Sequence, residues 1–366
     1  MKKVGILSMQ KVDNFGSILQ AFALKSILEQ IGGDVYFIDI KYGKQLFAQK
    51  ISIHRNRLLR RIEAEKKLII SNSFFRAHKE AYLFKKLLKK FLKYRKVLEL
   101  EKTHSDKFDL VVIGSDEVFN CCQICPWGYT LQLFGSDINS DQIVSYAASF
   151  GHTTLEELKQ NKINVEIGLS MRKFDSISVR DDNSYNIVNK LLGIPPQIHL
   201  DPVLIYDFST IINSSSVNES NYILVYSYPG RITDQAEIKY IRSMAKKRHK
   251  KIVCLYGYYA WADKYVIPES IFDVIKYFEM ADFVITDTFH GAIFSIITHS
   301  QFLTLVRPKN VRKITHLLNF LGLSDCMVTD INNISVIPKL INYESVDNIL
   351  VNERKKSIEY LTSFLQ

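Results

Sequence analysis

Four short polar turns in this chain each follow an apolar, strand-like run, and they carry the side chains best suited to chemistry. The turns hold Asn14, Gly16 and Ser17; Gly114, Ser115 and Asp116; Arg180 and Asp181; and Asp287, Thr288, His290 and Gly291. Because the carboxyl ends of parallel strands meet at one edge of a sheet, we expect these side chains to gather there. A single turn of this composition is an ordinary cap, but the four together, with an arginine and a histidine, favour an anion-binding cleft.

The chemistry of the individual residue types supports this interpretation. The guanidinium of Arg180 is a planar fork that matches carboxylate or phosphate. Glycines let the backbone approach a ligand, and Ser17 and Thr288 would present hydroxyls and amides at helix starts, where anions bind. An isolated core histidine is usually a satisfied polar group. His290, however, lies between the apolar strand-like run that ends at residue 286 and a helical run over 292–297, which favours a functional role.

Alternating strand-like and helix-like runs position these turns. Strands are expected at 4–9, 35–40, 108–116, 142–149 and 175–179, then at 222–228, 251–256 and 282–286, with helices at 17–30, 235–248, 268–280 and 345–365. We therefore predict an α/β protein with two Rossmann-like domains facing a cleft. The predicted first domain is residues 1–200, with a basic helical insertion at about 41–107. The predicted second domain is residues 201–345, and a C-terminal helix at 346–366 is expected to pack back across the domains.

Composition narrows the class of protein. With 366 residues, 47% hydrophobic content and 8 prolines, the chain is typical of a folded globular protein. No signal peptide is recognised, and no apolar run approaches the roughly 20 residues of a membrane-spanning helix, so we expect a cytoplasmic protein. The five cysteines, an odd number, argue against a disulfide framework. Cys121, Cys122 and Cys125 lack partners at zinc-site spacing, so no metal is predicted.

The positive charge is concentrated in one segment. Residues 41–107 contain 20 basic and 6 acidic residues, a net charge of +14, so the rest of the chain carries −4. Within this segment, residues 81–96 alternate apolar and basic side chains at helical spacing, with one apolar face formed by Phe84, Leu87, Leu88, Phe91 and Leu92. This pattern fits a packed helix with a solvated basic face, or an interfacial helix that contacts anionic membrane lipid. Nucleic acid is not predicted as a partner, because no recognised binding motif accompanies the charge.

An ordered set of motifs spans roughly residues 4–325: Asn14-Phe-Gly-Ser-Ile-Leu-Gln-Ala-Phe-Ala-Leu24, Val112-Ile-Gly-Ser-Asp-Glu-Val-Phe-Asn120, Ser145-Tyr-Ala-Ala-Ser-Phe-Gly151, Ile177-Ser-Val-Arg180, Asp201-Pro202 and Ile285-Thr-Asp-Thr-Phe-His-Gly291. This set resembles the polysaccharide pyruvyl transferase family. The resemblance implies a fold similar to GT-B glycosyltransferases. It also implies transfer of the enolpyruvyl group of phosphoenolpyruvate to a sugar diol of a surface polysaccharide repeat unit, which gives a pyruvate ketal and phosphate.

The resemblance also implies roles for individual residues. His290 matches the motif histidine and is expected to bind phosphoenolpyruvate and act as general acid, because an imidazolium can protonate the donor methylene near neutral pH. Arg180 matches the motif arginine and is expected to bind the donor anion. His152 is a weaker candidate for deprotonating the acceptor. The basic insertion is expected on the acceptor side, the acceptor could be lipid-linked at the inner face of the membrane, and no cofactor is expected.

The last motif departs from some family members, which have an arginine two residues before the histidine. This chain has Thr288 there, so the missing charge must come from elsewhere, with Arg307, Arg312 and Lys313 as candidates. Two other functions stay open. One is a GT-B-like glycosyltransferase that uses a nucleotide sugar in the same cleft, and the other is a non-catalytic sugar- or anion-binding protein of the same pathway.

Overall fold

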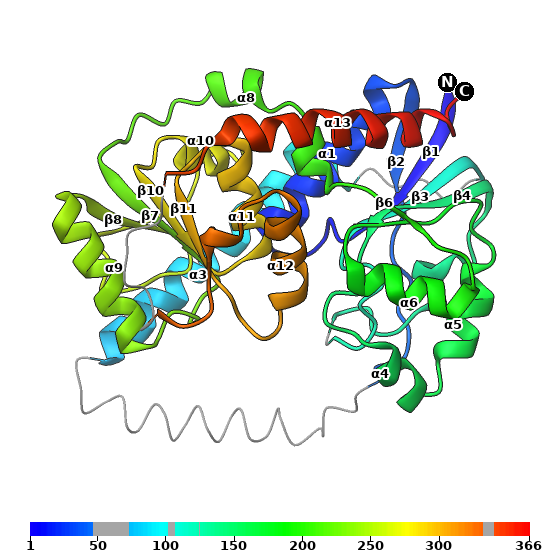
Figure 1. Ribbon diagram of the computed structural model, residues 1–366, viewed down its shortest axis with the longest axis horizontal. Coiled ribbons are helices and arrows are strands. Elements are labelled where there is room, and N and C mark those ends of the chain that lie inside the picture. The colour runs from blue at the N-terminus through cyan, green and yellow to red at the C-terminus, as the bar shows by residue number, and fades with distance from the viewer. Residues whose placement is uncertain (47–72, 102–106, 124, 332–339) are drawn as a thin grey trace.

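The computed structural model describes residues 1–46, 73–101, 107–123, 125–331 and 340–366 (Figure 1). Residues 47–72 of the predicted basic insertion lie outside the described residues. Two six-stranded parallel sheets, each flanked by helices, form the two halves of the molecule. This arrangement confirms the predicted α/β class with two Rossmann-like domains.

The first sheet has the strand order β2-β1-β3-β4-β5-β6. Its strands are β1 (Lys2–Leu7), β2 (Gly33–Phe37), β3 (Phe108–Asp116), β4 (Ser140–Ala148), β5 (Ser178–Val179) and β6 (Gln197–Ile198). Residues 4–7, 110–116 and 143–148 of the central strands are buried, as expected for a parallel sheet covered on both faces, and Val4 pairs with both Val35 and Leu110. The helices of this half are α1 (Phe15–Gln30), η1 (Leu131–Phe134), α4 (Leu155–Gln160), α5 (Asn164–Met171) and α6 (Asp182–Leu192).

The second sheet has the order β12-β11-β10-β7-β8-β9. Its strands are β7 (Tyr222–Ser227), β8 (Lys251–Tyr256), β9 (Lys264–Val266), β10 (Phe283–Thr286), β11 (Phe302–Leu305) and β12 (Met327–Val328). The accompanying helices are α9 (Gln235–Arg248), α10 (Asp273–Glu279), α11 (Phe289–Ile297), α12 (Val311–Phe320) and η2 (Ser324–Cys326). The helix predicted at 268–280 begins only at Asp273, because Ser270 and Asp273 form a turn in which the Ser270 amide donates to the Asp273 carboxylate.

Three elements connect the two halves on one side of the molecule. The chain passes from the first sheet to the second through α7 (Pro202–Ile205) and α8 (Ser209–Asn213), and α13 (Tyr343–Thr362) runs back over both halves (Figure 1). On α13, Arg354 Nε donates to Leu204 O at 2.6 Å, and the Tyr360 hydroxyl donates to Ser145 O at 2.9 Å. The C-terminal helix therefore ties the second half to the first, and the two chain ends lie together.

Helix α3 (Ser73–Val97), from the basic insertion, contacts both halves rather than the first domain alone. Its Phe91 ring packs edge-on against Phe15 of α1, at a centroid distance of 4.8 Å, and against Tyr256 of β8, at 6.0 Å. The predicted apolar face is partly wrong: Leu87 and Phe91 are buried, but Phe84 and Leu92 are exposed. The buried face turns toward Tyr94 instead, because the helix packs into the junction between α1 and β8.

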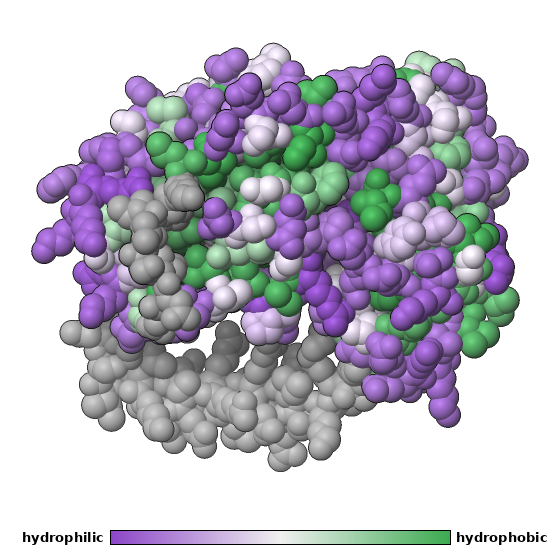
Figure 2. All heavy atoms as spheres, in the orientation of Figure 1, coloured by the Kyte–Doolittle hydropathy of each residue, from purple (hydrophilic) through white to green (hydrophobic). Residues whose placement is uncertain are grey.

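Hydrophilic side chains cover most of the face seen in Figure 2, and apolar ones form separate patches. No helix within the described ranges is long and apolar enough to cross a membrane.

Candidate functional site

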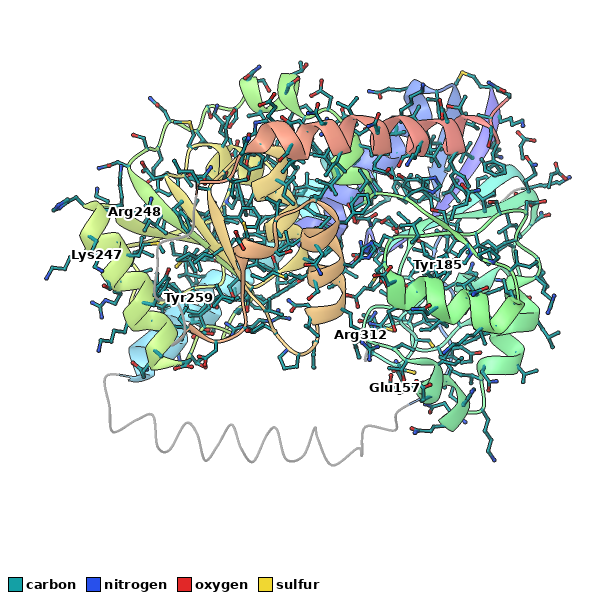
Figure 3. All side chains as sticks on the ribbon, viewed as in Figure 1. Glu157, Tyr185, Lys247, Arg248, Tyr259 and Arg312 are labelled. Carbon is teal, nitrogen blue, oxygen red and sulfur yellow. The ribbon has the colours of Figure 1, made fainter. Side chains whose placement is uncertain are left out.

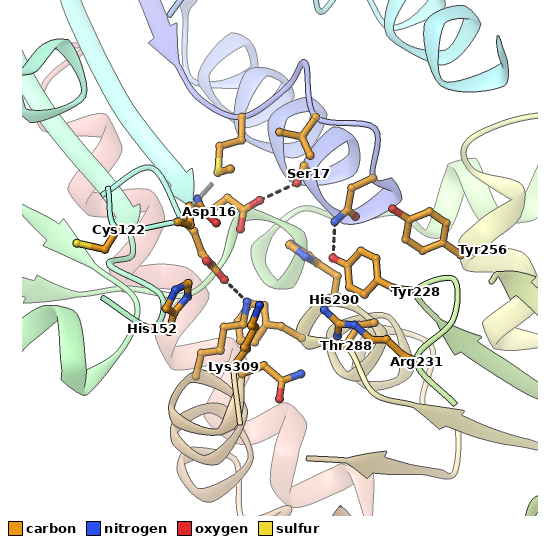
Figure 4. A pocket seen from close by; sticks show the side chains of 18 of the residues that line it. Ser17, Asp116, Cys122, His152, Tyr228, Arg231, Tyr256, Thr288, His290 and Lys309 are labelled. Atoms are coloured by element: carbon orange, nitrogen blue, oxygen red, sulfur yellow. Dashed lines mark hydrogen bonds and ion pairs between the residues drawn. The ribbon is translucent and has the colours of Figure 1, made fainter. Parts of the chain in front are cut away.

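A cleft of about 660 Å³ lies between the two sheets, at the carboxyl ends of their central strands (Figure 4). In the first sheet, the chain passes from β1 to β2 on one side and from β3 to β4 on the other, so the neighbouring strands β1 and β3 mark a switch point of the topology. Residues that come after these two strands, including Met9 and Glu117, line one wall of the cleft. In the second sheet, β7 and β10 have the same relationship, and Tyr228 and His290 line the other wall. Ligands of open α/β sheets bind at such switch points, and here two of them face each other.

His290 reaches this cleft from the first turn of α11. Thr288 is the N-cap, and its hydroxyl accepts a hydrogen bond from the Gly291 amide at 2.9 Å. The Gly291 amide is thereby used within the helix, and the amino end of α11, where an anion is favoured, lies at the cleft. His290 is only 6% exposed, and its Nε2 lies 3.7 Å from Asp201 Oδ2 without a hydrogen-bond partner among the described residues. A buried imidazole nitrogen facing a carboxylate can hold a proton beside the cleft.

Gly16 sits directly against His290, which explains its place in the polar turn after β1. A Cβ on Gly16 would lie 2.2 Å from Cγ and 2.3 Å from Nδ1 of the His290 ring. Gly16 is not among the described residues that line the cleft. The glycine is therefore required for close packing of α1 on the histidine, and not for approach of a ligand to the backbone as the sequence suggested.

Replacing Gly16 by alanine should displace the His290 ring and reduce turnover strongly, with a loss of stability of about 1–3 kcal/mol from overpacking. The measurement is steady-state turnover together with urea unfolding. Gly168→Ala in α5 is the matched control, because its Cβ would meet nothing closer than Leu191 O at 3.5 Å. Equal activity of the two variants would contradict the packing role.

Arg180 lies beneath the cleft and is held by two carboxylates. Its Nη1 donates to Asp201 Oδ2 at 2.6 Å and its Nη2 donates to Asp116 Oδ1 at 3.0 Å. The guanidinium also stacks on the Phe289 ring, 4.5 Å from the centroid, and the residue is 5% exposed. Arg180 does not line the cleft, and two of its N–H groups are used by these carboxylates, whereas its buried Nε has no hydrogen-bond partner among the described residues.

Asp116, Arg180 and Asp201 instead form a buried ionic network that supports the histidine. Asp116 is the last residue of β3, Arg180 and Asp201 follow β5 and β6 of the same sheet, and the Ser17 hydroxyl adds a 2.8 Å hydrogen bond to Asp116 Oδ2. Burial would raise the pKa of Asp116, but the charges of Arg180, His290 and Lys313 outweigh it, and the pKa lies below its ordinary value. For Asp201, burial is likewise outweighed by His290 and Arg180, which lower the pKa to about 2.

These lowered pKa values predict acid sensitivity. A carboxylate whose pKa is depressed by folding stabilises the native state above its unfolded value of about 3.9, and this stabilisation disappears as the pH falls through the native value. With a native pKa of about 2, Asp201 should contribute ~2 kcal/mol that is lost between about pH 4 and pH 2. Urea unfolding across this range should show a shallower pH dependence for Asp201→Asn than for wild type. Identical slopes would rule out this contribution.

Three cationic side chains face the cleft in place of Arg180: Arg231, Lys309 and Lys313. The Arg231 guanidinium stacks on Tyr228 at 4.2 Å, with Nη1 3.9 Å from Asp287 Oδ2. Lys313 forms an ion pair with Glu117 across the cleft. Lys309 is exposed and has no ion-pair partner in the described part of the chain. Lys313 was a candidate from sequence, but Arg231 and Lys309 carry no recognisable signal beyond their positions after a strand.

The remaining predicted residues divide into two groups. Asn14, Ser17, Asp116, His152 and Thr288 line the cleft with His290. Ser115, Asp287, Gly291 and Arg307 are not among the described lining residues. Gly291 is packed against the Thr286 side chain, and burial raises the pKa of Asp287.

Arg307 does not supply the charge that Thr288 lacks. Its Nη1 and Nη2 donate to the two carboxylate oxygens of Glu237, at 2.6 and 3.0 Å, and its Nε donates to Asp287 Oδ2 at 3.3 Å. The guanidinium is thereby committed to the second half. Arg312 extends from α12 toward the first half (Figure 3) and donates to Asn183 Oδ1 at 3.0 Å, outside the cleft lining. Sequence proximity to the motif was therefore a poor guide to which cation faces the cleft.

The three clustered cysteines are free and buried, and only Cys122 lines the cleft. No group of three or more His, Cys, Asp or Glu residues in the described ranges is arranged to hold a metal ion.

Comparisons with known proteins agree with the motifs. The sequence model of a family described as polysaccharide pyruvyl transferase matches residues 14–307. The comparison with curated proteins found no match. Among solved structures, the S. aureus MnaA–UDP co-structure is 11% identical, with a TM-score of 0.46, covering 99% of this chain and 91% of that one. A UDP-GlcNAc 2-epimerase from Methanocaldococcus jannaschii is 12% identical (TM-score 0.45; 96% and 92% covered). Spinosyn rhamnosyltransferase SpnG is 10% identical (TM-score 0.43; 100% and 95% covered). These likenesses are too distant to bear on what this chain binds.

Proposed function

Because this chain belongs to the polysaccharide pyruvyl transferase family, and is therefore a transferase, we propose that it moves the enolpyruvyl group of phosphoenolpyruvate onto a sugar diol. The product is a cyclic pyruvate ketal on a surface polysaccharide repeat unit, and phosphate is released. The observation that carries the proposal is His290 at the amino end of α11, in a cleft that it shares with Arg231 and Lys309.

The charges around the cleft suit this donor. Phosphoenolpyruvate presents a phosphate and a carboxylate, which require cationic side chains and backbone amides. Lys309 and Arg231 lie on the same wall as the amino end of α11. We assign these two residues to the donor anion, in place of Arg180 and of the arginine that Thr288 replaces. Arg180 then serves as a positioning residue, because it fixes Asp201 beside His290.

The reaction needs one proton at carbon and two sugar oxygens. A protonated His290 gives its proton to C3 of the donor, so that the methylene becomes a methyl group and positive charge develops at C2. One sugar hydroxyl attacks C2 and gives its proton to a base, the C2–O bond to phosphate then breaks, and the second hydroxyl closes the ketal and gives its proton to the departing phosphate. The proton taken by the base returns to His290 through solvent, which restores the acid. A positioned acid contributes about 10²–10⁴-fold to such a step. His152 lines the cleft, with its Nδ1 3.2 Å from Asn120 Nδ2, and it is the candidate base for the acceptor hydroxyl.

The test is thermal unfolding with phosphoenolpyruvate, with inorganic phosphate and with a panel of nucleotide sugars. A ligand that binds only the native state raises the midpoint. We expect a phosphoenolpyruvate shift that shrinks in Lys309→Met and persists in Lys173→Met, whose lysine bonds Ser136 far from the cleft. A shift with nucleotide sugars alone would indicate a glycosyltransferase. Binding without any His290-dependent phosphate release would indicate a non-catalytic binding protein.

The basic face of α3 supports a cytoplasmic site of action at the membrane, on a lipid-linked acceptor. Lys85, Lys86, Lys89, Lys93 and Lys96 are exposed on one side of the helix, whereas Lys90 is paired with Glu269. Exposed Tyr82, Leu92 and Val97 lie among these lysines. Basic side chains with interspersed apolar ones are the composition that binds an anionic lipid surface.

Neutralising Lys85, Lys86, Lys89 and Lys93 to glutamine should reduce binding to phosphatidylserine vesicles at low salt by about 100-fold or more, since each basic residue contributes about 1 kcal/mol. Vesicle sedimentation measures this. Neutralising Lys239, Arg242, Lys246 and Lys247, which are exposed on α9, removes the same charge and serves as control. If both quadruple variants bind equally, or if wild type does not bind, the membrane proposal falls.

A further inference from the structure

A second cavity, of about 190 Å³, opens beside the cleft at the carboxyl ends of β1 and β2. Its lining comprises Ser8, Met9, Gln10, Lys11, Asp39, Ile40, Tyr42, Pro126 and Trp127. Met9 also lines the main cleft, so the two spaces adjoin at this side chain. Pockets for drug-sized ligands measure about 300–1,000 Å³. This cavity is smaller, as expected for a single ring that extends from a ligand in the cleft.

The walls of this cavity are held in place by backbone hydrogen bonds. The Gly43 amide donates to Trp127 O at 2.7 Å, and the Tyr129 amide donates to Lys44 O at 2.9 Å. A Cβ on Gly43 would lie 1.7 Å from Tyr129 O, so only glycine permits this approach. The Lys41 amide also donates to the Gln132 side-chain oxygen at 2.7 Å. The loop that carries Tyr42 is thus joined to the loop that carries Trp127.

The polar side of the cavity contains an acceptor without a donor. Gln10 is 1% exposed, and its Oε1 has no hydrogen-bond partner among the described residues. Leaving a buried acceptor unsatisfied costs about 1–3 kcal/mol, a cost that a ligand hydroxyl would remove. Beside it, Lys11 and Asp39 form an ion pair at 2.5 Å, both half-exposed, which offers further donors and an acceptor to hydroxyl groups.

The geometry points to a saccharide subsite: Trp127 and Tyr42 contact the apolar face of a pyranose ring, Gln10 Oε1 accepts from one of its hydroxyls, and Asp39 accepts from another. The ring is that of the sugar adjoining the diol sugar in the main cleft. This inference rests on the proposed function in one respect: it assumes that the acceptor is a saccharide. It assigns recognition of the repeat unit to the ends of β1 and β2.

Trp127 provides a direct measurement, since the chain has two tryptophans, and Trp261→Phe leaves Trp127 as the only one. The full-length single-tryptophan protein is titrated, without phosphoenolpyruvate, with glucose, galactose, mannose and N-acetylglucosamine and with their di- to tetrasaccharides. We expect a saturable change in Trp127 fluorescence with at least one oligosaccharide. Tyr42→Ala and Gln10→Met should each weaken that binding by about tenfold, the equivalent of one hydrogen bond or ring contact.

Tyr82→Ala is the matched control, because Tyr82 is an exposed tyrosine on α3 and Tyr42 is 80% exposed, so that neither change removes a core contact. The absence of any saturable change, or equal affinity in Tyr42→Ala and Tyr82→Ala, would overturn the subsite; in that case a trapped water satisfies Gln10. Phosphate release from phosphoenolpyruvate is measured separately. Sugar binding without phosphate release would contradict the proposed donor chemistry but not the subsite. Phosphate release with an unchanged acceptor KM in Tyr42→Ala and Gln10→Met would contradict the subsite alone.

Discussion

Replacing His290 with glutamine should lower phosphoenolpyruvate-dependent phosphate release by about 10²–10⁴-fold, the contribution of a positioned general acid. Glutamine retains a polar side chain beside Asp201 but cannot carry the proton. The loss should appear in kcat rather than in donor affinity, because Lys309 and Arg231 remain to hold the anion. Phosphate release at saturating acceptor measures kcat, and thermal unfolding with phosphoenolpyruvate measures binding.

His299→Gln is the control for this experiment. His299 lies at the carboxyl end of the same helix, where it is stacked on Tyr343 and pairs with Asp347, away from the cleft. We expect it to retain wild-type turnover. Full activity in His290→Gln, with a native unfolding profile, would eliminate the histidine as the acid and would turn attention to the lysines that line the cleft, Lys309 and Lys313.

Replacing Arg180 with methionine should destabilise the protein by about 3–5 kcal/mol, the penalty for removing one partner of a buried ion pair. Asp116 and Asp201 would both lose their counter-charge, and the side chains of all three residues are almost completely buried. Urea unfolding followed by far-UV circular dichroism measures the loss. Activity should fall as well, because Asp201 would no longer be held beside His290.

A second variant separates a positioning role from donor binding. In Arg180→Met/Asp201→Asn one of the stranded charges is gone, so part of the stability should return while activity does not. Arg312→Met, which removes an exposed hydrogen bond to Asn183, should change stability by less than about 1 kcal/mol. If Arg180→Met is as stable as wild type and instead raises the KM for phosphoenolpyruvate, the arginine binds the donor, as its motif suggested.

Family membership identifies the motif residues but does not fix what each one contacts. Arg180 and Arg307 are arginines near the right motifs, yet both are neutralised by carboxylates from distant parts of the chain. Lys309 and Arg231 follow no motif; Lys309 has no ion-pair partner among the described residues, and Arg231 Nη1 lies 3.9 Å from the Asp287 carboxylate. An unpaired or loosely paired cation attracts an anionic substrate more readily than one held in a close ion pair, and this is the physical basis for proposing these two residues as the donor ligands.

The sequence by itself determined the alternating α/β architecture, the four polar turns and the position of His290 at a helix start. These features depend on short-range effects: apolar runs long enough for buried strands, helical periodicity, and N-cap residues such as Asn14 and Thr288. The predicted strand at 4–9 is β1, and the predicted turn after β10 begins α11 as expected.

Only the tertiary structure decided which side chains face the cleft and which lie behind it. Arg180 pairs with Asp116 and Asp201, 64 and 21 residues away, and Gly16 packs on a histidine from the other half of the molecule. Helix α3 likewise buries Phe91 and Tyr94 at the junction of both halves, whereas Phe84 and Leu92, which its periodicity placed on the same face as Phe91, are exposed. Contacts of this kind join strands that are distant in the sequence, or the two halves of the molecule, and no local pattern of residues encodes them.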